Sequence, residues 1–298
     1  MIQWKLMFLL PLALVMACSG ADMLEEDAAL GGHGRFGLVY VSYDHDWAES
    51  GDAVVLTSTA QFVRYSAMDR EQVARLLALP LHPDRDLPAL DRCQVYDLSV
   101  DVVAEETLEN EETGSVELLE AGDLNIQTEE RTVTLSPRHF PWLLPFISGV
   151  VYGEAQSSAV EKVSGVKASA AGGAVGSFTA QVTSPELPRL LQVGAAEPAP
   201  LVNVASDEPL AVRWSTAASG GADVTYTELR YTRGKREMAL RCRVRDDGAF
   251  ELPVASLAEL SGKVTLEVVR LRRSFFDTAG LDNGELRLAV RDTVTIEL

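Results

Sequence analysis

Alternation of apolar and polar residues is the strongest local pattern in this chain, and it is most regular in the C-terminal part. Residues 238–245 read MALRCRVR, so apolar side chains and arginines fall on opposite faces of an extended strand. Residues 210–214 and 286–290 alternate in the same way. Asn-Gly within 282–284 favours a hairpin turn, because both residues tolerate positive φ. Strands and turns at this spacing predict a β-sandwich over residues 178–298.

The N-terminal half contains similar strand patterns and one helix pattern. Residues 36–43 and 53–65 are rich in β-branched and aromatic residues, and the polar loop 44–52 between them predicts an antiparallel pair. Ser66-x-x-Asp69 has the form of a capping box, which predicts a short helix that ends before Pro80. Further strands are expected near 93–103 and at 116–119, 124–128 and 132–135.

Residues 155–177 differ in composition from the rest of the chain. Fifteen of these twenty-three residues are Ala, Ser or Gly, so the segment has little apolar area to bury. It is interpreted as a linker or an edge hairpin between an N-terminal mainly β domain (36–154) and the C-terminal sandwich (178–298). The expected fold class is mainly β, as two β-sandwich-like domains or one large β domain, with one or two short helices.

The first eighteen residues have the pattern of an export signal. Lys5 supplies a positive charge, the eleven residues 6–16 are all apolar, and Ala17 is a small residue directly before Cys18. A helix that crosses a bilayer needs about twenty apolar residues, so a permanent span is not expected here. Residues 1–17 are therefore interpreted as a cleaved signal peptide, and the acidic and glycine-rich residues 18–35 as a flexible tether.

This leader resembles bacterial lipoprotein signals. The resemblance implies that cleavage precedes Cys18 and that its sulfur carries a diacylglyceryl group. Val15 and Met16 depart from the most frequent residues of that pattern, and an ordinary signal peptide with an incidental cysteine is the alternative. Two or more acyl chains would hold the protein stably on a membrane. Ser19 is not the aspartate of inner-membrane retention signals, so the resemblance favours the outer membrane.

The strand 210–214 followed by Val224-x-Tyr226 resembles immunoglobulin-like and fibronectin type III sandwiches. The chain departs from the immunoglobulin pattern because no cysteine precedes Trp214 to pair with Cys242. Taken whole, it resembles the uncharacterised β-rich lipoproteins that many Gram-negative bacteria export. That resemblance implies a place in the cell envelope and no particular activity.

Charge argues against one class of partner. The net charge is −18, which makes nucleic acid an improbable ligand. Between Arg92 and Arg131 there are many acidic residues and no basic residue, whereas residues 230–273 are locally rich in arginine. These two regions either attract each other, steer a partner, or form separate solvated surfaces.

Cysteine and histidine usage defines few candidate sites. Cys93 and Cys242 fall in different predicted domains, so a disulfide and a buried free thiol are both open interpretations. The four histidines follow no zinc motif: His33, His45, His82 and His139. No catalytic motif such as G-x-S-x-G is present in the sequence. We therefore expect no resident metal or cofactor, and we nominate no catalytic residue.

Two loops are candidate contact sites. Asp44, His45, Asp46 and Glu49 lie together in the first predicted hairpin loop and could offer oxygens to calcium, although turn formation also explains them. Prolines bracket Phe140, Trp142 and Phe146, so this segment is neither a long helix nor a central strand. It is either an exposed contact loop or an aromatic plug at the end of a sheet.

The sequence predicts a lipid-anchored, non-catalytic protein of the cell envelope that binds or scaffolds a partner. The membrane is contacted through Cys18, and the expected partner is an envelope protein or a glycan. Two alternatives remain: an envelope hydrolase whose site is assembled from distant residues, and an adhesion module that depends on carbohydrate or calcium.

Overall fold

The computed structural model describes residues 32–48, 53–99, 114–139, 146–153, 158–205, 207–217, 221–258 and 260–298. The predicted signal peptide, Cys18 and most of the tether lie outside these residues. So do Glu49, Phe140 and Trp142, and most of the acidic segment that follows Ser99. Within the described residues, no helix is both long and apolar enough to cross a membrane.

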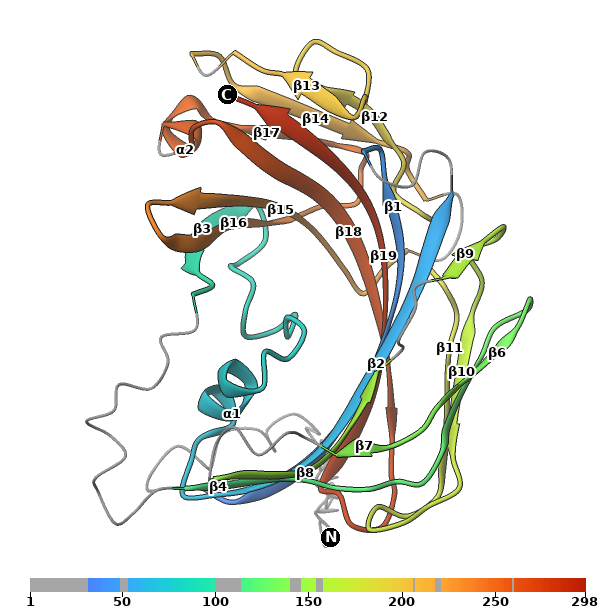
Figure 1. Ribbon diagram of the computed structural model, residues 1–298. Coiled ribbons are helices and arrows are strands. Elements are labelled where there is room, and N and C mark those ends of the chain that lie inside the picture. Colours follow the sequence, from blue (N-terminus) through green and yellow to red (C-terminus); the bar gives the residue numbers. More distant parts are fainter. Residues whose placement is uncertain are drawn as a thin grey trace, which may run out of the picture.

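A large mixed sheet forms the centre of the molecule (Figure 1). Its main path runs through ten strands, in the order β3, β16, β15, β18, β19, β1, β2, β4, β8, β7, and β13 and β9 pair with β19 and β2. The strands along this path are β3 (Arg92–Asp97), β16 (Arg236–Val244), β15 (Val224–Arg233), β18 (Lys263–Phe276), β19 (Asn283–Glu297), β1 (Gly34–Asp46), β2 (Val54–Ser66), β4 (Ser115–Leu118), β8 (Ile147–Gly153) and β7 (Arg138–His139). The two attached strands are β13 (Leu201–Asn203) and β9 (Ser158–Val160).

The first and last strands of the described chain are neighbours in this sheet. β1 and β19 pair in parallel over eleven residues, from Phe36 opposite Asn283 to Asp46 opposite Thr293. β19 also pairs along its whole length with β18, and its residues 284–290 are all buried. Burial on both faces is typical of a central strand, and it means that the charged side chains of β19 need partners within the protein.

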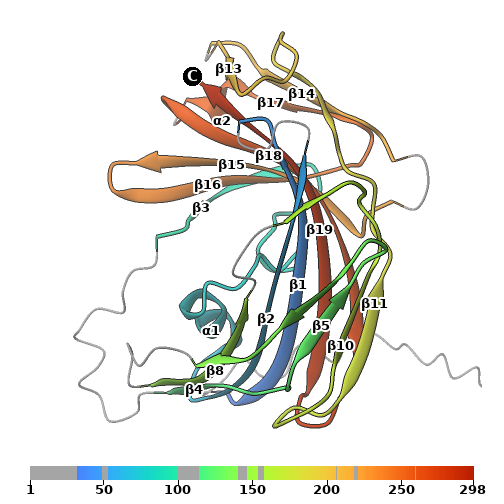
Figure 2. The same ribbon diagram turned by 45° about the vertical axis from the view of Figure 1, so that its right-hand side comes forward.

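Two smaller sheets cover the convex face of the large sheet (Figures 1 and 2). A four-stranded sheet packs on its lower half, and a three-stranded sheet packs on its upper half. The first contains β11 (Phe178–Val182), β10 (Val166–Ala170), β5 (Leu124–Gln127) and β6 (Thr132–Leu135). The second contains β12 (Leu190–Val193), β14 (Leu210–Trp214) and β17 (Ala249–Leu252). The predicted mainly β fold is confirmed, with two short helices, α1 (Arg70–Leu76) and α2 (Val254–Leu257), among the described residues.

Each pair of layers encloses its own apolar core. In the lower core, Phe178 stacks on Phe276 with ring centroids 4.1 Å apart, and Phe62 packs against Phe178 at 5.7 Å. In the upper core, Trp214 of the three-stranded sheet packs with Leu266 of β18 in one cluster. The pleat of β18 and β19 thus sends alternate side chains into these cores and the others to the concave face.

The predicted domain boundary does not separate the sheets. Residues from both predicted domains, 36–154 and 178–298, contribute neighbouring strands to the large sheet. Within the small-residue segment 155–177, the structure describes β9 and β10, and β10 lies between β11 and β5. The segment is therefore neither a free linker nor an edge hairpin.

The small residues of this segment permit close contact between backbones. Gly172 has a φ of +104°, and a Cβ there would lie 2.9 Å from the backbone nitrogen of Ser177. The turn that contains it is held by backbone hydrogen bonds from Gly172 to Ala121 and from Gly176 to Ala279. This segment contributes to the fold by close packing of its backbone rather than by burial of large side chains. A count of apolar residues does not detect such packing.

Two local predictions were wrong in detail. Asp69, not Ser66, is the N-cap of α1: its carboxylate accepts from the Gln72 backbone at 2.7 Å, and the Gln72 side chain accepts from the Asp69 backbone. Asn283 and Gly284 are the first residues of β19 rather than the centre of the hairpin turn. The turn lies just before them, where Gly280 supplies a φ of +88°.

The concave face is partly covered by α1 and the loop 77–91 (Figure 1). Val73 and Leu77 pack against Phe36 and Val63 of the large sheet, and Leu87 packs against Val224, Tyr226, Val269 and Ala289. Arg287 of β19 donates to the carbonyls of Pro80 and Leu81 at 3.0 and 2.8 Å, and this fixes the loop on the sheet.

If the large sheet makes one folding unit, damage to either core will shift the same unfolding transition. Phe62→Ala in the lower core should cost about 3–5 kcal/mol and Leu266→Ala in the upper core about 2–5 kcal/mol. Both variants should retain a single transition in urea, measured by far-UV circular dichroism and tryptophan fluorescence. Leu191→Ala is the control, since that side chain is 56% exposed. A second transition that moves in only one variant would show two independent domains.

Candidate functional site

The upper part of the concave face carries a line of charged side chains from five adjacent strands. The pleat places them on one face, opposite the apolar residues of the upper core. We call this line the ion-pair row, and it consists of Asp44 (β1), Arg291 (β19), Glu267 (β18), Arg230 and Glu228 (β15) and Arg241 (β16). Three acids and three arginines make the row formally neutral.

Arg291 connects one half of the row. Its Nε lies 2.5 Å from Asp44 Oδ1 and its Nη1 lies 3.6 Å from Glu267 Oε2. Arg291 Nη2 also donates to the hydroxyl of Tyr40 at 2.7 Å. Burial lowers the pKa of Arg291, but Tyr40 and the two carboxylates outweigh it, so that pKa lies well above its ordinary value. Arg291 is thus a permanent cation at the centre of the face.

Glu228 connects the other half. One of its carboxylate oxygens accepts from Arg230, and the other accepts from Arg241 Nε at 2.6 Å. The Arg241 guanidinium lies over the ring of Tyr96 on the neighbouring strand β3, 4.8 Å from the ring centroid. Planar guanidinium groups suit such combined pairing and stacking. Tyr96 therefore extends the row to the edge of the sheet.

The pKa values of the two glutamates of the row are shifted in opposite directions from their ordinary value. Glu228 and Glu267 are directly opposite each other in the pairing of β15 with β18. Burial raises the pKa of Glu228, but Arg230 and Arg241 outweigh it and the pKa lies below its ordinary value. Burial raises the pKa of Glu267 as well, and Arg291 and Arg230 offset only part of this, so its pKa stays above the ordinary value.

Carboxyl groups with separated pKa values are a feature of acid–base catalysis, but these two are poorly placed for it. Their side chains are only 2% and 8% exposed, so a substrate has no direct access to them in this conformation. The accessible part of the row is instead Arg230, which is 49% exposed, together with the half-buried Tyr96. What this face offers is a set of fixed hydrogen-bond donors and an aromatic ring.

The loop predicted to offer oxygens to calcium is differently arranged. Asp44, His45 and Asp46 belong to strand β1, not to the loop. His45 points to the opposite face from Asp44, where its Nδ1 lies 2.5 Å from Asp292 Oδ1 with both side chains fully buried. Asp292 also accepts from the Leu190 backbone at 2.6 Å, so the pair joins β19 to β12. No group of three potential metal ligands occurs among the described residues.

Cys93 and Cys242 are joined by a disulfide in the structure. They are directly opposite each other in the pairing of β3 with β16, which means that the two halves of the sequence meet here as adjacent strands. The bridge fixes the edge strand that carries Tyr96. The free-thiol interpretation does not fit this geometry.

The aromatic loop is only partly described. Phe146 is half-buried and packs against the cluster that contains Val116 and Ile147, as a plug would. Phe140 and Trp142 lie outside the described residues.

The arginine-rich region 230–273 pairs mainly with nearby acids. Arg236 pairs with Asp97 at 2.9 Å, Arg245 with Asp91 at 3.0 Å, and Arg273 with Asp84 at 2.6 Å. Arg270 is fully buried and pairs with Asp246 at 2.7 Å. The basic region is therefore a set of strand-to-strand and strand-to-loop contacts rather than one free cationic surface.

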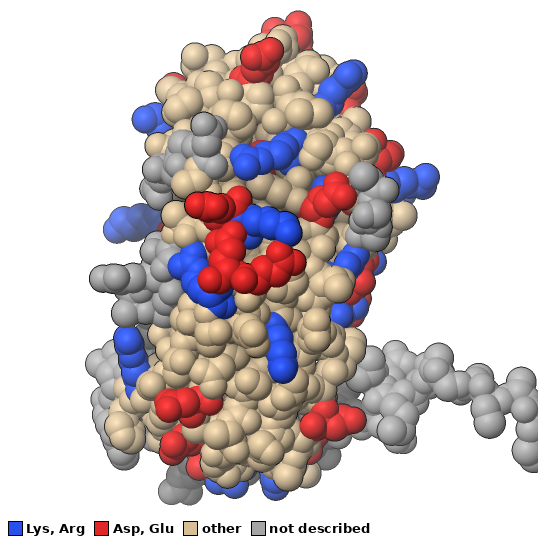
Figure 3. Space-filling model, turned by 90° about the vertical axis from the view of Figure 1, so that its right-hand side faces the viewer, with Lys and Arg blue, Asp and Glu red and all other residues tan. Residues whose placement is uncertain are grey.

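The outer face of the molecule contrasts with the concave face. The side chains that the four-stranded sheet turns outward are almost all neutral and polar: Asn125, Gln127, Thr132, Thr134, Lys167, Ser169, Thr179 and Gln181. Figure 3 shows this side of the molecule, and charged groups are correspondingly sparse over much of its lower half. This contrast favours the concave face as the candidate site.

Sequence reasoning did not find the ion-pair row. Its members are spread from Asp44 to Arg291, and only the strand order brings them together. The available signal was local: Glu228 and Arg230 are two residues apart in one predicted strand region, so they share a face, and charges of opposite sign on one face can pair. Comparison with models of protein families found no match for this chain, and comparison with curated proteins found none either.

The opposite pKa directions predict opposite effects of neutralising the two glutamates. Glu228→Gln should lower the free energy of unfolding at neutral pH by about 1–3 kcal/mol, because Arg241 loses its buried partner. The pKa of Glu228 is depressed, so its contribution is present above the unfolded value of 4.5 and is lost as pH falls through the folded pKa. The difference in free energy of unfolding between Glu228→Gln and the wild type should therefore become smaller as the pH is lowered.

Glu267→Gln should behave in the reverse manner. The pKa of Glu267 is raised in the folded protein, so the stability that its neutral form contributes is lost as pH rises through the folded pKa. The variant keeps a neutral side chain, so its free energy of unfolding should rise relative to that of the wild type towards neutral pH. Urea unfolding over a pH series measures both effects. Equal losses in both variants at every pH would contradict the assigned pKa directions.

Proposed function

We propose that this chain is a lipid-anchored protein of the cell envelope that binds a partner, without catalysis, through the upper concave face. The observation that carries the binding role is the ion-pair row, whose charged groups are held in place by five adjacent strands. A surface that is already ordered loses little conformational entropy on binding. The exposed Arg230 and the half-buried Tyr96 are residue types that often dominate binding energy.

The sequence of the leader supports the anchor. A lipid on Cys18 would be followed by the tether 18–35, and β1 begins at Gly34. The start of β1 is held to the β18–β19 turn, since the Arg35 backbone donates to Asp282 at 2.7 Å and the Asp282 backbone donates to Arg35 at 2.9 Å. The anchor would therefore attach at this end of the large sheet.

The binding face lies toward the other end of the same strands. Asp44 is ten residues beyond Gly34 in β1, which corresponds to about 30 Å along an extended strand. Phe275, which is 68% exposed, lies in β18 close to the anchored end. This arrangement would direct the ion-pair row away from the membrane and towards an envelope protein or glycan.

The anchor is tested by metabolic labelling with a fatty acid. The wild-type protein should incorporate label and fractionate with membranes, and Cys18→Ser should lose both, because no other described or predicted feature provides acylation. Cys93→Ser is not a suitable control, since it breaks the disulfide; Ser19→Ala is suitable because it leaves the cysteine intact. Label retained in Cys18→Ser, or a leader still attached in the mass spectrum of the mature wild type, would contradict the proposal.

The binding face is tested by crosslinking in intact envelopes. Arg230→Glu and Tyr96→Ala should each reduce recovery of the crosslinked protein or glycan several-fold, because both remove accessible groups of the row and its extension. Arg213→Glu is the matched control: Arg213 is exposed on β14, in the three-stranded sheet on the opposite side. Equal recovery from all three variants, each shown to be folded, would place the partner on another surface.

A further inference from the structure

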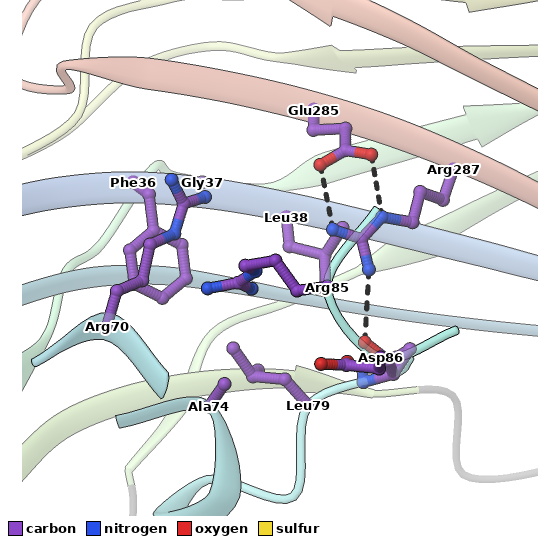
Figure 4. A pocket seen from close by; sticks show the side chains of 11 residues that line it. Phe36, Gly37, Leu38, Arg70, Ala74, Leu79, Arg85, Asp86, Glu285 and Arg287 are labelled. Atoms are coloured by element: carbon purple, nitrogen blue, oxygen red, sulfur yellow. Dashed lines mark hydrogen bonds and ion pairs between the residues drawn. The ribbon is translucent and has the colours of Figure 1, made fainter. Parts of the chain in front are cut away.

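A small cavity lies at the lower end of the concave face, apart from the ion-pair row. It is enclosed by β1, β19, α1 and the loop 77–91, and its volume is about 20 Å³. A single water requires roughly 10–15 Å³, so the cavity itself admits about one ligand oxygen, and the rest of a ligand would lie at its mouth beside the exposed Arg85. Figure 4 shows three arginines around it, Arg70 from α1, Arg85 from the loop and Arg287 from β19.

Arg287 is fully engaged by the protein. Its side chain is 4% exposed and donates to both oxygens of Glu285, at 2.7 and 2.8 Å. Its remaining nitrogen donates to Pro80 and Leu81. This arginine therefore forms a wall of the cavity and supplies positive potential, but it has few donors left for a ligand.

Arg70 and Arg85 are in a different situation. Arg70 lies over the ring of Phe36, 4.6 Å from the centroid, and donates to the side-chain carbonyl of Asn283 at 3.2 Å. A guanidinium has five N–H donors, so most of those of Arg70 remain. Arg85 extends between Arg287 and Arg70 in Figure 4. Within the part of the chain that the structure describes, neither Arg70 nor Arg85 forms an ion pair with a carboxylate.

Two acids, Asp86 and Glu285, line the cavity together with the three arginines, so the formal charge of the lining is +1. Glu285 is paired with Arg287, and the carboxylate of Asp86 accepts from the backbone of His82 at 2.6 Å. Burial lowers the pKa of Arg70, and the neighbouring charge of Arg85 lowers it further. Burial, followed by Arg287 and Arg85, lowers the pKa of His82 to about 4. Burial is the larger cause of both pKa shifts, and the neighbouring arginines add to it, in agreement with the net positive charge of the lining.

We propose that this cavity and its mouth form a binding site for an oxyanion, a carboxylate or phosphate group whose oxygens are held by Arg70 and Arg85. Guanidinium groups match the geometry of both anions and bind them through paired N–H donors. Phe36, Leu38 and Leu79 line the apolar side, where they strengthen the charge interaction of the partly buried Arg70, whereas Arg85 is exposed at the mouth. The site is independent of the lipid anchor and of the ion-pair row.

The test is a calorimetric titration of the folded wild-type chain with inorganic phosphate and, separately, with acetate, with chloride replaced so that ionic strength is constant. Saturable binding of at least one of them is expected. Arg85→Gln should weaken it about tenfold or more, because one charged partner is lost. Arg85→Lys should keep part of the affinity. Arg75→Gln is the control: Arg75 is on the same helix, is 72% exposed and does not line the cavity.

A second readout is the titration of His82 by NMR, with its resonance identified from its absence in His82→Gln. Addition of the anion should raise the pKa of His82 from about 4 in the wild type and in Arg75→Gln. In Arg85→Gln the loss of the Arg85 charge already raises this pKa, and the same concentration of anion should change it little. The proposal is overturned if neither anion binds, or if Arg85→Gln binds as tightly as the wild type. Either result can occur whether or not Cys18 carries a lipid, so this test is separate from that of the anchor.

Discussion

The parallel pairing of β1 with β19 is the contact on which the rest of this structure depends. It joins the two ends of the described chain over eleven residues and places β1, which pairs with β2 along its other edge, beside the long β18–β19 hairpin. Without it, β1, β2, β4, β8 and β7 would be separated from the part of the sheet that contains β19, β18, β15, β16 and β3. Contacts of such large sequence separation are slow to form, since closing a long loop costs conformational entropy before the contacts stabilise the structure.

The pleat of these central strands separates two kinds of surface. Residues such as Leu286, Leu288 and Val290 face the smaller sheets, and Glu285, Arg287 and Arg291 alternate with them on the concave side. The same alternation that builds the core therefore aligns charges opposite it. Charges in strands need partners, and here the partners come from the same strand, from neighbouring strands and from the loop 77–91. Both the ion-pair row and the cavity with its three arginines are products of this arrangement.

The sequence allowed the mainly β class, most strand positions and the short helix to be predicted, because period-two alternation and capping chemistry are local signals. Residues 124–127 and 132–135 fell close to the expected strands for this reason. Strand order is not local, so the pairing of β1 with β19 and the meeting of Cys93 with Cys242 could not be derived. The prediction of a linker or edge hairpin for the segment 155–177 was wrong because its glycines and alanines pack through their backbones. The charged sites were missed because their members share a face only after the sheet has formed.

Native-state hydrogen exchange at the amides of β1 and β19 tests most directly whether this pairing unites the molecule. The account predicts that the buried amides of Val39, Val41, Leu288 and Val290 exchange only through global unfolding, with the same free energy as the denaturant-induced transition. Exchange of the β1 amides at a clearly lower free energy, while those of β19 stay protected, would show that β1 detaches on its own and would contradict the account.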